Sequence, residues 1–151
     1  MNYYDKPVVQ SFLPESSTTK GIVQEHFEGH QTPLVERLRE GLPMAEFRSL
    51  RELLLIPEEE LGRLLGISPA TLNRRKKAMS KLTTTESEHI VRFARLFGQT
   101  LEVFEDEDAT RDWLKTDNPG TAGESPLSYA DTEFGAREVE NLLGRIDHGV
   151  F

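Results

Sequence analysis

The strongest structural signal in this chain is EEELGRLLGISPATLNRRKKAM, residues 58–79. Two short helices that pack at a steep angle need a small residue where they cross and a turn residue that tolerates a left-handed conformation. Gly62 meets the first need and Gly66 the second. Four apolar residues are placed to pin the second helix against the first: Leu61, Leu65, Ile67 and Leu72. The pattern therefore predicts a helix-turn-helix.

The second helix of this unit is predicted to have an inner and an outer face. Leu72 and Met79 lie seven residues apart and are expected to point inward together. The opposite face would then present a set of residues to DNA: Ala70, Asn73, Arg74 and Lys77. Asn can pair with adenine and Arg with guanine through two hydrogen bonds each, whereas Lys more often contacts phosphate. Base reading is therefore assigned first to Asn73 and Arg74.

The other polar residues of the segment are predicted to hold the helix on the DNA backbone. The Ser68 hydroxyl can cap the second helix, whose amino-terminal end is the part that reaches base edges in the major groove. Backbone contacts are assigned to Arg75, Lys76 and Lys81, and Thr71 could make either kind of contact. The alternative is that these basic residues form only a solvated helix face, but the preceding turn motif favours a role in DNA binding.

The charge of the 151-residue chain is unevenly distributed. A net charge of -8 by itself argues against nucleic acid, because counterion release by Lys and Arg drives binding to phosphates. Residues 68–81, however, hold five basic residues and no acidic one. Residues 99–151 hold four basic and thirteen acidic residues, a net charge of -9. This asymmetry predicts two surfaces with different partners.

Composition and motifs argue against several classes of protein. The absence of cysteine excludes disulfides, thiolate ligands and a cysteine nucleophile. The four histidines are too scattered for a recognisable metal site, and neither an HExxH motif nor a Gly-rich phosphate loop occurs, so no enzyme, metal or cofactor is predicted. No export signal and no uncharged apolar run of about 18 residues is present, so we expect a cytoplasmic protein.

Hydrophobic spacing along the chain predicts an all-α fold, because no segment alternates with a period of two. Three regions are predicted: a flexible arm over residues 1–31, a helix-turn-helix domain over 32–83 and a second helical domain over 84–151. Whether the arm is a disordered terminus or docks on the protein is left open. The expected helices cover residues 32–41, 43–55, 57–66, 68–79, 84–98 with Thr84 or Thr85 as the cap, and 135–146. Residues 116–126 are expected to form a turn-rich loop.

The chain also shows an ordered set of residues beyond the helix-turn-helix. They are LGRLLGISPATLNRR (61–75), ARLFG (94–98), Ala109, Trp113, Leu114, Asn118, Pro119, Gly123, Ser125, Pro126, Leu127, Thr132, Gly135, Val139, Leu142, Ile146 and Gly149. In this order they resemble the Xre/MbcA/ParS antitoxins of RES-Xre toxin–antitoxin pairs. The resemblance implies a homodimer that binds operator DNA, represses its own operon and neutralises a RES-domain, NAD-degrading toxin by direct contact. It also implies that residues 84–151 dimerise and bind the toxin, and that the chain catalyses nothing.

The acidic second half is predicted to carry the toxin-binding surface. A site for the NAD pyrophosphate must offer positive charge, so a partner of opposite sign suits it. We place the contact on the last helix and the residues that follow it, 135–151. Its acidic residues are expected to pair with basic residues of the toxin, and its apolar residues to enter a cleft of the toxin. The assigned residues are Glu138, Glu140, Arg145, Ile146, Asp147, Val150 and Phe151. The alternatives are that this helix is core and its acids are solvated, or that the chain is a helix-turn-helix transcription regulator with no toxin partner.

Overall fold

The computed structural model describes residues 7–13 and 31–149, with the side chains of 31 and 32 left aside, and these residues form helices and no strand. In chain order the elements are η2 (Val9–Phe12), α2 (Gln31–Glu40), α3 (Met44–Leu54), α4 (Glu58–Leu65), α5 (Pro69–Ala78), α6 (Thr84–Phe104), α7 (Glu107–Lys115), η3 (Pro119–Thr121), α8 (Pro126–Tyr129) and α9 (Glu133–Asp147). The predicted all-α class is confirmed.

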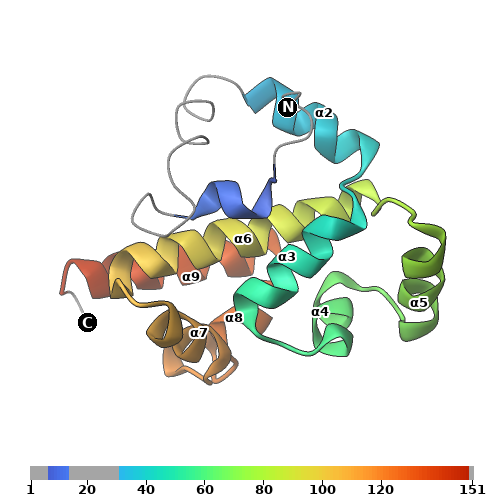
Figure 1. The fold of residues 1–151 in the computed structure, drawn as a ribbon. Coiled ribbons are helices and arrows are strands. Elements are labelled where there is room, and N and C mark those ends of the chain that lie inside the picture. Colours follow the sequence, from blue (N-terminus) through green and yellow to red (C-terminus); the bar gives the residue numbers. More distant parts are fainter. Residues whose placement is uncertain (1–6, 14–30, 150–151) are drawn as a thin grey trace.

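Helix α6 is the central element of the molecule (Figure 1). Its 21 residues span about 30 Å, and it contacts α2, α3, α4, α7, α9 and η2. Helices α4 and α5 lie near the end where α6 begins, and α7 lies near the end where it finishes. Because α6 is covered on several sides, large side chains such as Ile90, Phe93 and Phe97 are fully buried. Helices of both predicted regions therefore pack on α6.

The limits predicted for this long helix were wrong at both ends. Its cap is Thr83 rather than Thr84 or Thr85, because Thr83 and Glu86 form a reciprocal capping box. The helix also continues through Gly98, where an end was expected, to Phe104. The reason for Gly98 is close packing: a Cβ atom there would lie 2.0 Å from the carbonyl oxygen of Phe12. Gly98 thus makes room for a neighbouring chain segment and does not terminate the helix.

The inward position predicted for Met79 was also wrong. Helix α5 ends at Ala78, and Met79 adopts a left-handed conformation with φ 52° as the C-cap. The helix ends one residue before Met79, so helical spacing from Leu72 no longer sets its direction. The Met79 side chain is 86% exposed. Leu72 is buried as predicted. Gly66 is left-handed with φ 74°, as the turn requires.

The remaining boundaries show smaller differences. The last helix begins at Glu133, two residues earlier than expected, because the Thr132 hydroxyl caps it. Val139 and Leu143 are buried in it, whereas Leu142 and Ile146 are half-buried. The expected loop over 116–126 holds only the short η3 before α8 begins. Of the predicted arm, residues 8 and 9 are buried in the core, while residues 1–6 and 14–30 lie outside the described residues.

Helix α7 joins the second half of the chain to the end of α3. The guanidinium Nε of Arg111 donates to the carbonyl oxygen of Leu53 at 2.7 Å, and the Lys115 ammonium donates to that of Leu54 at 3.2 Å. Carbonyl groups at the end of a helix lack partners within it and carry partial negative charge, so cations stabilise them. Arg111 also lies 5.9 Å from the centre of the Phe97 ring. These contacts fix the two halves against each other.

We expect Arg111→Ala to lower the free energy of unfolding by about 2 kcal/mol, because a partly buried carbonyl then loses its donor. Urea denaturation followed by circular dichroism measures the change. The matched control is Arg48→Ala, since Arg48 lies exposed on α3, and it should stay within about 0.5 kcal/mol of the wild type. Equal stability of the two variants would contradict the role assigned to the α7 contact.

Candidate DNA-binding and toxin-binding surfaces

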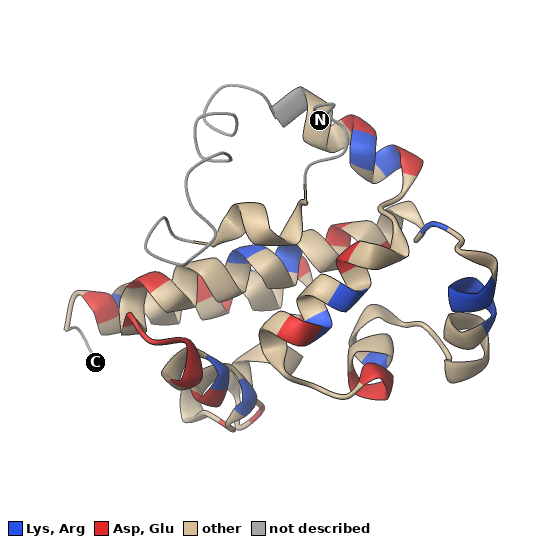
Figure 2. Cartoon of the chain, in the orientation of Figure 1, with Lys and Arg blue, Asp and Glu red and all other residues tan. Residues whose placement is uncertain are grey.

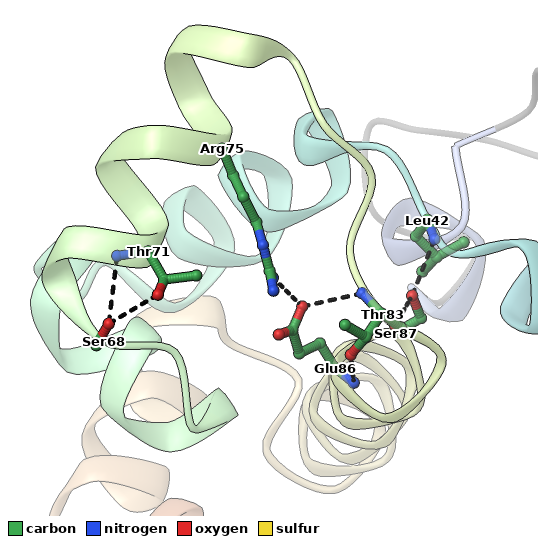
Figure 3. A network of polar contacts seen from close by, with 7 residues as sticks. All are labelled: Leu42, Ser68, Thr71, Arg75, Thr83, Glu86 and Ser87. Atoms are coloured by element: carbon green, nitrogen blue, oxygen red, sulfur yellow. Dashed lines mark hydrogen bonds and ion pairs between the residues drawn. The ribbon is translucent and has the colours of Figure 1, made fainter.

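The turn between α4 and α5 has the geometry that the sequence predicted. A Cβ atom on Gly62 would lie 3.2 Å from the carbonyl oxygen of Ile67 in the turn and 3.6 Å from a side-chain methyl group of Leu72 on α5, so a larger residue would crowd both. The Ser68 hydroxyl accepts the backbone N–H of Thr71 at 3.2 Å and donates to the Thr71 hydroxyl at 2.9 Å (Figure 3). Ser68 is thus the cap that orients α5.

The outer face of α5 presents the residues predicted to face DNA. Ala70, Asn73, Arg74 and Lys77 are all exposed. Figure 2 shows Lys and Arg gathered on α5, and no acidic residue occurs between Ser68 and Lys81. Within the part of the chain that the structure describes, Arg74 and Lys77 form no ion pair. This face therefore offers free donors and positive charge to an anionic partner.

Two of the basic residues predicted to contact phosphate already form ion pairs within the protein. Arg75 forms an ion pair with Glu86 at the start of α6, and its side chain is only 17% exposed (Figure 3). Lys76 pairs across the unit with Glu58, at 2.8 Å between Nζ and Oε1. The structure therefore distinguishes Arg75 and Lys76 from Arg74 and Lys77, which form no ion pair among the described residues, and the Arg75–Glu86 pair is the more buried of the two ion pairs. Lys81 is exposed in the segment between α5 and α6.

Glu86 is a residue of this region that the sequence analysis missed. Its carboxylate accepts the backbone N–H of Thr83 at 2.9 Å as well as the Arg75 guanidinium. One carboxylate thus caps α6 and holds α5 against it, so it orients the exposed face of α5. The spacing of Thr83 and Glu86 is the capping-box signature, and it was readable in the sequence.

The residues assigned to toxin binding lie on different faces of α9. Glu138 and Arg145 are exposed and lie seven residues apart, which places them on one side of the helix. Glu140 faces α6 instead, where its Oε1 lies 3.4 Å from Nε of Arg95. Ile146 is half-buried and Asp147 exposed. Val150 and Phe151 lie outside the described residues. The structure therefore brings together only part of the assigned set.

Phe134 is an apolar surface residue that the sequence analysis missed. It is 81% exposed in the first turn of α9. Helical spacing places it on the same side as three exposed residues: Glu138, Asn141 and Arg145. We call these four residues the α9 face. Aromatic side chains supply large contact areas where they meet a protein partner. The inward spacing of Val139 and Leu143 would have revealed its outward direction.

The neighbouring Glu133 fixes the start of α9 on α6. Its carboxylate lies 3.3 Å from Nε of Arg92 and 3.4 Å from a guanidinium nitrogen of Arg95. Desolvation acts to raise the pKa of Glu133, but the hydrogen bond from Arg92 and the charges of both arginines outweigh it and lower the pKa. Glu133 is therefore ionised at neutral pH, and Phe134 follows a firmly attached residue.

Within the residues that the structure describes, no group of three or more His, Asp or Glu side chains is arranged to hold a metal ion. None of the helices in that part of the chain has the length and apolar character needed to span a lipid bilayer.

Comparison with known proteins divides the chain in two. Residues 33–95 match the family described as the antitoxin Xre-like helix-turn-helix domain. Residues 99–149 match the family described as the antitoxin Xre/MbcA/ParS C-terminal toxin-binding domain. Both the end of the first match and the start of the second fall within α6.

Relatives of similar length are known from several bacteria. Antitoxin Xre of Yersinia enterocolitica is 36% identical over 121 residues, which are 80% of this chain and 82% of that protein. Antitoxin Xre of Photorhabdus laumondii subsp. laumondii is 34% identical over 114 residues, 75% of this chain and 77% of that protein. The Prs ADP-ribosylating antitoxin of Sphingobium sp. is 24% identical over 123 residues, 76% and 77% of the two chains.

Proposed function

Because the chain belongs to the Xre/MbcA/ParS antitoxin family, we propose that it neutralises a RES-domain toxin that degrades NAD and represses the operon encoding both proteins. It acts as a homodimer in the cytoplasm, binds over the active site of the toxin and catalyses no reaction itself. The observation that carries this proposal is the presence of two separate surfaces on one helical body. These are the basic outer face of α5 and, in the acidic second half, the α9 face with its exposed Phe134.

The proposed repression depends on α5 entering the major groove of operator DNA. In this proposal Asn73 and Arg74, exposed in the middle of α5, read base edges, and Lys77, one turn further along, contacts phosphate. Ser68, Ala70 and Thr71 lie at the capped amino-terminal end of the helix, where close approach to the DNA is expected. Lys81 adds a backbone contact beyond the helix. A homodimer would present two such helices to two half-sites, as helix-turn-helix repressors do.

Two observations support a toxin that consumes NAD. The second half carries a net charge of -9, which suits a partner whose active site must attract a pyrophosphate. One relative is named an ADP-ribosylating antitoxin, and ADP-ribosyl groups are derived from NAD. In this proposal Glu138, Asp147 and, after release from Arg95, Glu140 pair with basic residues of the toxin. Ile146 and the terminal residues Val150 and Phe151 supply apolar contact.

The test is to express the tagged chain together with each gene adjacent to its own and to purify it. We expect one small protein to co-purify, to degrade NAD when separated from this chain, and to lose that activity when the chain is added at equimolar ratio. NAD loss and transfer of ADP-ribose to protein are measured separately, so that the two toxin chemistries are distinguished. A chain that binds its promoter but retains no neighbouring gene product would instead support the transcription regulator without a toxin.

A further inference from the structure

Residues 7–13, which we call the strap, cross the helical body at a position that neither family match includes. The matches begin at residue 33, yet Val8 and Val9 are 2% and 1% exposed, as buried as the centre of the core. Element η2 lies along α6 in Figure 1 and contacts both α6 and α3. A segment of seven residues with two fully buried apolar side chains occupies a defined site rather than a loose surface position.

A buried carboxylate holds the first half of the strap. Glu46 of α3 is 5% exposed, and its Oε1 accepts the backbone N–H of Val8 at 2.8 Å. Its Oε2 accepts the backbone N–H of Val9 at 3.0 Å. Both oxygens are thus used to bind two consecutive backbone donors, and a buried carboxylate without such donors would be strongly unfavourable. Glu46 therefore recognises the strap through its backbone.

Gly98 of α6 allows the second half of the strap to pack closely on this helix. A Cβ atom there would lie 2.0 Å from the carbonyl oxygen of Phe12, so any other residue would force the strap away. Glycine in the middle of a helix is less favourable than alanine, and here the close approach of the strap offsets that disadvantage. Phe12 and Leu13 then pack against the core as partly buried side chains.

We propose that the groove between α3 and α6 is an intramolecular peptide-binding site for the strap, and that the docked strap clamps the DNA-binding half to the toxin-binding half. Glu46 lies in the range matched by the helix-turn-helix family, and Gly98 lies in the short interval between the two matches. The strap therefore reaches from α3, in the first match, to the interval of α6 that directly precedes the second match. It keeps α3 seated on α6, and α4, which packs on both α5 and α6, keeps its orientation as a consequence.

Hydrogen exchange in the full-length chain tests the proposal, with Val9→Asp as the variant and Gln10→Asp as its matched control. Asp at position 9 places a second carboxylate beside Glu46, whereas Gln10 is exposed and can accept the same charge. We expect Val9→Asp to speed exchange over residues 8–13 at least about tenfold and to weaken protection in α3 and the middle of α6. The last turns of α9 should keep native protection, and Gln10→Asp should match the wild type throughout.

A second pair of variants tests the site from the side of the helix. Gly98→Ala should release the strap, while Gly144→Ala, where a Cβ atom meets nothing within 4 Å, should leave it docked. Both changes favour helix, so release of the strap in the first variant cannot result from unfolding of α6. Native exchange over residues 8–13 in both Val9→Asp and Gly98→Ala would overturn the binding site. Loss of protection in every helix would overturn it too, because the segment would then be part of an indivisible core.

The clamp is tested by the affinity of these variants for operator DNA, and this step rests on the proposed function. Release of the strap should weaken operator binding at least about fivefold although every residue of α5 is unchanged. Unchanged affinity in a variant whose strap exchanges freely would overturn the clamp. A wild-type chain that binds no operator would contradict the proposed repression alone, since the exchange measurements still report on the strap.

Discussion

Replacing Arg74 with alanine should weaken binding to the operator by roughly 1 to 3 kcal/mol and reduce the preference for operator over scrambled DNA. Arg74 is exposed on the outer face of α5, and no ion pair holds it among the described residues. Its guanidinium is thus free to form two hydrogen bonds with a guanine. Binding isotherms on both DNA sequences at two salt concentrations measure the loss.

Two neighbours of Arg74 serve as controls with different expected results. Lys77→Ala should weaken binding to both sequences about equally and lower the salt dependence by roughly one unit, as a phosphate contact requires. Arg75→Ala should chiefly lower stability, because Glu86 then loses its ion pair with α5. An Arg74 variant that keeps full operator affinity would refute the assignment of this face to the groove.

Phe134→Ala should weaken binding to the toxin by about 2 kcal/mol or more, roughly thirtyfold in Kd, so that more antitoxin is needed for neutralisation. The side chain is 81% exposed beside Glu138 on the α9 face, so its removal leaves the core of the antitoxin untouched. Met79→Ala is the matched control, because Met79 is a similarly exposed apolar residue that lies in the DNA-binding half. The measurement is NAD breakdown by the toxin as the antitoxin is titrated.

Deleting residues 147–151 tests whether these last residues contribute to toxin binding independently of the α9 face. We expect the shortened chain to keep its fold and its affinity for DNA, but to allow NAD breakdown at equimolar ratio with the toxin. If this chain inhibits fully, the tail does not close the toxin site. If Phe134→Ala and Met79→Ala inhibit equally well, the α9 face is not the contact, and other residues of the second half must form it.

Elements built from contacts close in sequence were predicted well. The turn at Gly66, the Ser68 cap and the inward direction of Leu72 all depend on residues within about one helical turn of each other, so their pattern is visible in the sequence. The cap of α6 at Thr83 is equally local, and its prediction at Thr84 or Thr85 is the usual error of one or two residues at a helix end.

Only the tertiary structure distinguishes residues of the same type that have different surroundings. Arg74 and Arg75 are adjacent and identical, but Glu86, eleven positions further along, turns the second into a support of the fold. Gly98 is a residue type that often ends a helix, yet it lies inside α6. Its small size is needed there because a segment some 86 positions earlier in the sequence packs against it. The sequence by itself determined the helical class, the DNA-binding motif and the uneven charge. The docked strap and the role of Glu46 in holding it depend on long-range packing, and no local period encodes that packing.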